Sequence, residues 1–179
     1  MANIDAPFGL RPVRMMNGGK IPMRKYANKG ATTAVYQGDI VVLQAADGRV
    51  LRLANTSTNA DIIGVAANYV AAGTAGQELW VYDDPFTVFE LQSDGTTAAD
   101  YTDHIGAVGP VLVTAGSTTT GVSKMELDVS QVTSSGTASN NVVKIIGVSD
   151  NVRNDSSSSH CVVEVLVFQH FLNHRSASV

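Results

Sequence analysis

The sequence has little that would build a disulfide framework, a membrane span or a helical core. A single cysteine, Cys161, excludes an internal disulfide and fits a protein made in a reducing cytosol. No apolar run approaches the roughly eighteen residues of a membrane helix, and the N-terminus has no apolar signal-peptide core, so we expect neither. Aromatic residues make up only 6% of the chain, and Glu and Lys are scarce beside Ser, Thr, Gly and Ala. This composition is typical of a β-protein with many small-residue loops.

Motifs for catalysis or cofactor binding are also missing. The sequence contains no GxSxG, P-loop, GxGxxG or CxxC pattern. His170 and His174 have the spacing of a zinc helix, but Phe171 stands where that motif needs its glutamate. Cys161 directly follows His160, so on a strand the two side chains point to opposite faces. We therefore predict that the protein is not an enzyme, with no catalytic residue, metal ligand or cofactor-binding residue.

Positive charge is concentrated in the first thirty residues. Residues 1–30 carry six Lys and Arg against one acid, formally +5, whereas the rest of the chain is formally −9. Pro7 and Pro12 fix φ and remove backbone donors, which favours extended geometry. We predict that residues 1–30 form an extended basic arm, which attaches an acidic body to a larger, negatively charged partner. A frayed terminus or one edge strand is the alternative.

Short apolar runs predict an all-β body over residues 31–170, followed by a C-terminal tail at 171–179. The hydrophobic pattern indicates an antiparallel β-barrel or sandwich. The only helix expected is a short one at about 97–105, where Thr97 and Asp100 form a weak capping-box pattern. The expected strands are 40–43, 49–53, 61–66, 78–82, 86–91, 109–114, 124–129, 142–149 and 161–168.

One segment of the body is repeated. Residues 62–65 read Ile-Ile-Gly-Val, as do residues 145–148, and each copy precedes a loop and another apolar run. The glycine within each predicted strand indicates a β-bulge or a close backbone approach. We predict two related β-subassemblies, at about 31–95 and 105–170. They would be two halves of one barrel or sandwich, or two small barrels.

The last predicted strand is apolar on both faces. Val163, Val165 and Val167 share one face, and only Glu164 interrupts the other. A strand buried on both faces has this pattern. We predict that it lies in the core or at a subunit interface, with these three valines as interface residues.

Trp80 and Tyr82 share one face of another predicted strand. Two aromatic side chains at this spacing can form a stacking platform for sugars, although packing under a hairpin is more common. The acidic body argues against nucleic-acid binding, because phosphate contacts need clustered Lys and Arg.

Several pieces of the chain resemble small head or cement proteins of tailed bacteriophages. The resemblance begins with the opening Ala-Asn-Ile-Asp-Ala-Pro-Phe-Gly-Leu-Arg-Pro-Val and is scattered over most of the chain. None of the pieces is a catalytic signature. The other pieces are 38–41, 62–65, 85–92 (PFTVFELQ), 125–128, 143–148 and 163–167, with His170 just beyond.

The resemblance implies a capsid decoration protein: a β-rich homotrimer on the exterior of an icosahedral virion, made in the host cytoplasm. Its partners would be the major capsid protein and itself, with no membrane and no direct nucleic-acid contact. A carbohydrate- or receptor-binding β-domain of a virion or tail, using Trp80 and Tyr82, is the alternative function.

The arm is the predicted capsid-binding segment. An extended arm can add to a sheet edge of a neighbour with few side-chain anchors. Phe8 and Leu10 are the apolar candidates for such anchors. The full set of expected capsid-contact residues is Pro7, Phe8, Leu10, Arg11, Pro12, Arg14, Lys20, Arg24 and Lys25.

Overall fold

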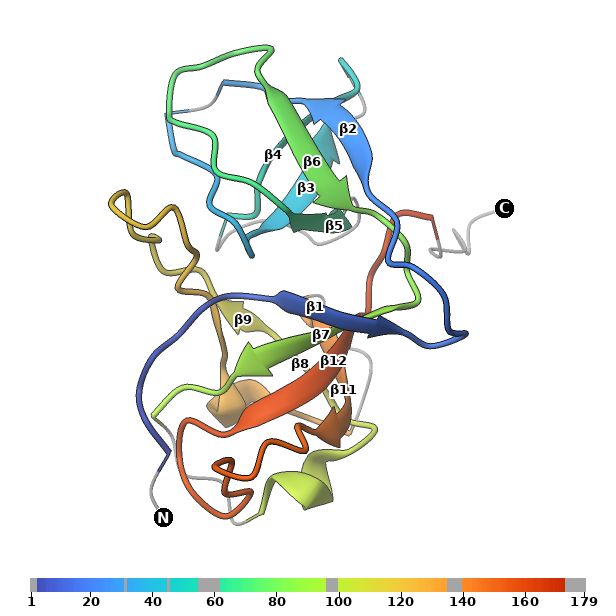
Figure 1. The fold of residues 1–179 in the computed structure, drawn as a ribbon, viewed down its shortest axis with the longest axis vertical. Coiled ribbons are helices and arrows are strands. Elements are labelled where there is room, and N and C mark those ends of the chain that lie inside the picture. Colours follow the sequence, from blue (N-terminus) through green and yellow to red (C-terminus); the bar gives the residue numbers. More distant parts are fainter. Residues whose placement is uncertain are drawn as a thin grey trace.

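The computed structural model describes residues 3–30, 32–44, 46–54, 62–95, 100–134 and 140–172. Within these ranges the protein is almost entirely β, with two five-stranded sheets, one short two-stranded sheet and no α-helix (Figure 1). All strands pair antiparallel inside their sheets. The prediction of an all-β, antiparallel fold is therefore confirmed. In the described part of the chain, no helix is long and apolar enough to cross a membrane.

The first sheet has the order β2-β6-β5-β3-β4. Its edge strands approach each other through a parallel bridge between Asn28 and Val50, but no continuous ladder closes it into a barrel. The β3–β4 hairpin turns through Gly48, whose φ of 67° suits glycine. The strands are Arg24–Ala27 (β2), Ile40–Gln44 (β3), Arg49–Arg52 (β4), Ile62–Ala66 (β5) and Glu78–Tyr82 (β6).

The second sheet has the order β1-β7-β12-β11-β8, and a small β9–β10 pair adjoins it. A parallel bridge between Ser93 and Leu127 joins the end of β7 to β10. Its strands are Arg11–Met15 (β1), Thr87–Gln92 (β7), Val108–Gly109 (β8), Val111–Leu112 (β9), Glu126–Leu127 (β10), Val143–Val148 (β11) and Val162–Val167 (β12).

The two five-stranded sheets face each other across the main core. Ile40 and Ile62 of the first sheet pack in one apolar cluster with Phe89, Ile145 and other residues of the second. The far side of the first sheet covers a second, smaller cluster that includes Val41 and Leu79. All five residues of β5 are therefore buried. In Figure 1 the first sheet occupies the upper half and the second the lower half.

The two halves of the chain repeat one topology. The order β2-β6-β5-β3 in the first sheet matches β7-β12-β11-β8 in the second. The parallel bridge from the end of β2 to β4 (Asn28–Val50) corresponds to the parallel bridge from the end of β7 to β10 (Ser93–Leu127). The register of β5 against β3 skips Ile63, and that of β11 against β12 skips Ile146, so the second isoleucine of each copy is skipped, although against strands that do not correspond. The shared unit begins at β2 and at β7, so β1 is an addition to the second half.

Residues 3–30 are part of both sheets and not a separate arm. β1 pairs with β7, and β2 pairs with β6. Pro12 fits this role because β1 is an edge strand with an irregular register between Pro12 and Arg14, where a missing donor costs nothing. The sequence analysis gave one edge strand as the alternative for this region. It did not expect two strands, because their polar residues face solvent and leave only a weak alternating pattern.

The helix expected at 97–105 is a single 3₁₀ turn, Tyr101–His104 (η2). The Asp100 side chain caps it by accepting a hydrogen bond from the Thr102 backbone N–H at 2.9 Å. Thr97, the other half of the expected capping box, lies outside the described residues. A second 3₁₀ turn, Val129–Gln131 (η3), follows β10.

Candidate functional site

The N-terminal segment, residues 3–15, lies along the second sheet and is held by side chains of the body. Buried Gln92 accepts a hydrogen bond from the Ala6 backbone N–H at 3.0 Å and donates one to the Ile4 carbonyl at 2.8 Å. The Leu10 N–H donates to the Gly38 carbonyl at 2.9 Å. A Cβ added at Gly9 would lie 2.5 Å from the Ser123 Cβ, so the backbone is in close contact there.

Acidic side chains of the body neutralise the basic N-terminal region within the same chain. Five of its six basic residues form ion pairs, so the charge difference between the two regions is matched internally. Three of these ion pairs, those of Arg11, Arg24 and Lys25, have a partner at least half exposed, so each of the three contributes little stability. The pairs are Arg11–Glu90, Arg14–Glu164 at 2.6 Å, Arg24–Asp83 at 3.3 Å, Lys25–Glu78 at 2.8 Å and Lys29–Asp47 at 3.9 Å.

The expected capsid-contact residues differ in their accessibility. Leu10 is 1% exposed in the main core, which removes it as an anchor for a partner. Pro7, Phe8 and Pro12 are half-buried, and the Arg11 guanidinium lies 4.6 Å from the centre of the Phe8 ring. The basic residues Arg11, Arg14, Lys20, Arg24 and Lys25 are exposed.

The proposed interface valines are core residues. Val163 and Val165 are fully buried and Val167 is 6% exposed, all within the main cluster between the sheets. They face the molecule's own interior, since they pack against residues of both sheets in this cluster. Of the two locations expected for this strand, the core or a subunit interface, the structure shows the core, so these three valines are not accessible to a partner.

Three chain connections between the sheets meet on one side of the molecule (Figure 1). They are residues 16–23, residues 83–86 and residues 168–172. The Met16 N–H donates to the Phe86 carbonyl at 3.0 Å, which places the first two connections in contact. Five exposed apolar side chains project from them: Met16, Met23, Phe86, Phe171 and Leu172. We call these five residues the crossover surface.

Trp80 and Tyr82 line a shallow hollow of about 360 Å³ together with Met23, Ala67 and Asn68. Trp80 is 42% exposed, whereas Tyr82 is half-buried and packs against the main core, with its ring centre 6.3 Å from that of Phe89. The polar groups of Asn68 are already engaged, because its side chain accepts from the Trp80 N–H at 2.7 Å. Lys25 lies 5.8 Å from the Trp80 ring centre.

A buried polar cluster joins the two halves. The Asp39 carboxylate accepts hydrogen bonds from the Ser123 hydroxyl at 2.6 Å and the Tyr36 N–H at 2.8 Å, and it pairs with Arg52 at 2.9 Å. Burial raises the pKa of Asp39, while these partners oppose the rise. Among the described residues no histidine joins this Ser–Asp pair, so we interpret it as structural.

The side chains of Cys161 and His170 are both buried, so neither is accessible to a ligand in solvent. Cys161 is fully buried, and burial raises the pKa of its thiol to about 11, which keeps it protonated and inert. His170 is 1% exposed beside β5, and burial lowers its pKa. His174 lies outside the described residues, so the His170–His174 spacing has no structural counterpart.

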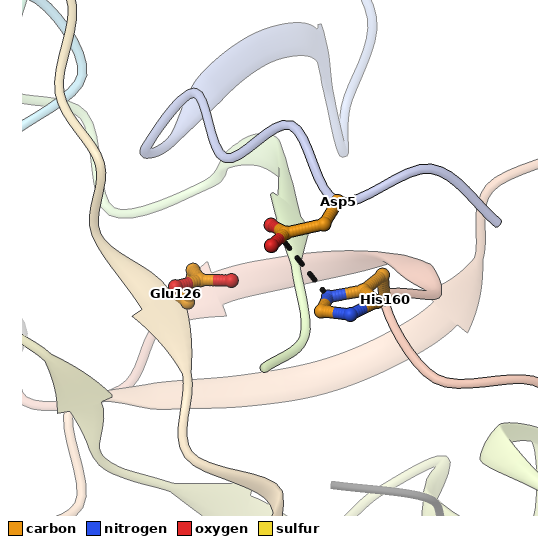
Figure 2. Close-up of side chains that lie close together, drawn as sticks. All are labelled: Asp5, Glu126 and His160. Atoms are coloured by element: carbon orange, nitrogen blue, oxygen red, sulfur yellow. Dashed lines mark ion pairs between the residues drawn. The ribbon is translucent and has the colours of Figure 1, made fainter. Parts of the chain in front are cut away.

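One cluster of metal-ligating side chains was not foreseen. Asp5, Glu126 and His160 come from the N-terminal segment, β10 and the loop before β12, and Figure 2 shows them turned toward one another. The sequence gives no local signal for this cluster, because more than thirty positions separate each residue from the next. Burial, together with the charges of Asp5 and Asp94, raises the pKa of Glu126, whereas His160 opposes the rise.

Comparison with known proteins yields no assignment: no family model matches the chain, and no curated protein matches it.

Proposed function

We propose that the protein is a virion structural protein that binds the outer surface of an icosahedral bacteriophage capsid and stabilises it. Its partners are the major capsid protein and, in a homotrimer, further copies of itself. The proposal also takes it as a protein without enzymatic activity, assembled onto the virion in the host cytoplasm. The pieces of sequence that resemble phage head proteins support this function.

The crossover surface is the observation that carries the proposal. Exposed apolar residues that gather in one place mark interaction sites more often than scattered ones do. Met16, Met23 and Phe86 are each about half exposed, although they are large and apolar. Lys20 lies on the same connection as the two methionines and has no ion-pair partner among the described residues. Exposed apolar residues on three neighbouring connections, with an unpaired cation on one of them, fit a shell surface that offers an apolar groove beside an acid.

This surface replaces the arm as the proposed capsid contact. Arg11, Arg14, Arg24 and Lys25 already pair with acids of the chain, so binding through them would exchange one ion pair for another. Apolar contact and Lys20 are therefore expected to supply most of the affinity, and we expect added salt to weaken binding only slightly.

The test is binding to shells assembled from the major capsid protein of the same phage. We expect Phe86→Ser to weaken binding at least tenfold, because a central apolar anchor dominates such interfaces. Val152→Ser is the matched control, since Val152 is fully exposed in the β11–β12 loop, away from the three connections. Equal binding by both variants would reject the crossover surface as the contact, and no binding by the wild type would reject the function.

Glycan binding at the Trp80 hollow is the second candidate. Its support is the exposed Trp80 face beside Tyr82 on one strand face. A glycan array with the wild type and Trp80→Ala tests it: binding that depends on Trp80 but not on Phe86 would favour this function over capsid decoration.

A further inference from the structure

We propose that Asp5, Glu126 and His160 bind one divalent transition-metal ion, best matched by Zn²⁺, which fastens the N-terminal segment to the body. One ligand atom of each residue lies within 4.8 Å of the other two (Figure 2). The site is separate from the crossover surface and goes beyond the proposed function. The sequence analysis expected no metal ligand, since none of these residues lies near another in the sequence.

The donor set selects the kind of metal. One imidazole nitrogen with two carboxylates suits Zn²⁺ and neighbouring transition metals, whereas Ca²⁺ and Mg²⁺ prefer oxygen ligands alone. If the three donor atoms were 4.8 Å apart, each would have to move about 0.7 Å toward their centre to reach a zinc–ligand distance of about 2.1 Å. Asp5 can make this movement readily, because its side chain is 66% exposed.

The backbone around two of the three ligands is already fixed by a single buried side chain. Gln92 hydrogen-bonds to Ile4 and Ala6, the residues on either side of Asp5. Its amide also donates to the His160 carbonyl at 3.1 Å. Residues 3–6 and the loop before β12 are thereby held side by side, as a preorganised binding site requires.

His160 has an open coordination position. Its Nδ1 is buried without a hydrogen-bond partner among the described residues and lies 3.9 Å from the nearest Asp5 oxygen. An unpaired buried nitrogen is costly, and a bound cation would satisfy it. The ring lies beside Gly95, where an added Cβ would be 3.4 Å from the His160 Cε1.

The charges at the cluster also favour a cation. Asp5 and Glu126 form no ion pair with a Lys or Arg among the described residues. Asp94 adds a third negative charge close enough to act on Glu126. Carboxylates that share a site repel each other, and a divalent ion removes that repulsion. A proton on His160 would relieve it in part, so the experiment must distinguish metal from proton.

The test is calorimetric titration of the metal-free full-length protein with ZnCl₂ at pH 7.5, with MgCl₂ and CaCl₂ in parallel. We expect one Zn²⁺ per chain with micromolar or tighter affinity and no comparable binding of Mg²⁺ or Ca²⁺. Asp5→Asn should weaken Zn²⁺ binding at least tenfold, because it removes one charged ligand from an exposed position. Asp150→Asn, which changes an exposed acid in the β11–β12 loop, should leave it unchanged.

Thermal unfolding supplies the second measurement. Zn²⁺ should raise the Tm of the wild type and of His174→Gln, but not that of His160→Gln. Failure of the folded wild type to bind Zn²⁺ at about 100 μM would overturn the proposal. Zn²⁺ binding that survives both Asp5→Asn and His160→Gln would place the metal elsewhere and overturn it too. A Tm that falls equally with and without Zn²⁺ in Asp5→Asn would identify a simple Asp5–His160 ion pair instead.

Discussion

His170 shows how a single buried residue makes stability depend on pH. It is 1% exposed, its Nδ1 accepts a hydrogen bond from the Leu172 N–H at 3.2 Å, and burial lowers its pKa despite the opposing charge of Asp83. The folded protein therefore favours the neutral ring, whereas the unfolded chain binds a proton below about pH 6.5. Because the unfolded state binds more protons there, stability is lost as the pH falls through this range.

We expect the free energy of unfolding to decrease below about pH 6.5 by up to about 1.4 kcal/mol per pH unit. Urea denaturation between pH 5 and 8 measures this slope. His170→Gln should flatten it, whereas His104→Gln, at a half-buried 3₁₀ turn, should not. An unchanged slope in His170→Gln would show that another group is responsible.

At the scale of elements, the repeated Ile-Ile-Gly-Val segments share a bulge but not the same need for glycine. Gly64 has a φ of 149°, and a Cβ there would lie 2.1 Å from the Tyr82 carbonyl oxygen. At Gly147 the nearest atom, Oε2 of Glu164, would be 3.6 Å away, an ordinary contact. The two glycines also differ in backbone conformation, because only Gly64 has a positive φ.

Alanine substitution at both glycines tests this difference. We expect Gly64→Ala to destabilise the protein by about 3 kcal/mol, through the backbone clash and an unfavourable φ. Gly147→Ala should change the free energy of unfolding by less than about 1 kcal/mol. Chemical denaturation of the two variants gives both values, and equal losses would mean that the bulges are equivalent.

Sequence patterns predicted the strands of both halves, with boundaries displaced by a few residues. These strands carry continuous or alternating apolar residues, as β5 and β12 do, so the sequence pattern predicts which of their faces are buried. For residues 1–30 one edge strand was only the alternative to an extended arm, because β1 and β2 are short edge strands with charged outward faces. The ion pairs Arg11–Glu90 and Arg14–Glu164 could not be predicted from the sequence either, since they depend on which strands lie near β1.

The Asp5–Glu126–His160 cluster marks the limit of sequence reasoning about sites. Local motifs reveal ligands only when one element carries several of them, as in a zinc helix. Here each ligand comes from a different segment, and Gln92 brings two of them together through backbone contacts. Only the fold supplies that proximity.

At the scale of the whole molecule, the N-terminal segment completes the sandwich. The sequence analysis treated residues 1–30 as an extended arm that attaches the body to a partner. In the structure Leu10 is 1% exposed in the main core, and β1 covers the edge of β7. The excess of positive charge in this region is matched by acids of the body and does not by itself indicate an external partner.

Leu10→Ala should therefore destabilise the free protein by about 3 kcal/mol through lost burial and a cavity. Arg14→Ala, which removes a half-exposed ion pair with Glu164, should cost less than about 1 kcal/mol and serves as its control. Thermal unfolding by circular dichroism compares the two, and deletion of residues 1–15 should lower Tm further, because it also removes β1 and the partners of Gln92. If the deletion leaves Tm unchanged, the segment is detachable after all, and the edge of β7 is open to a strand from another chain.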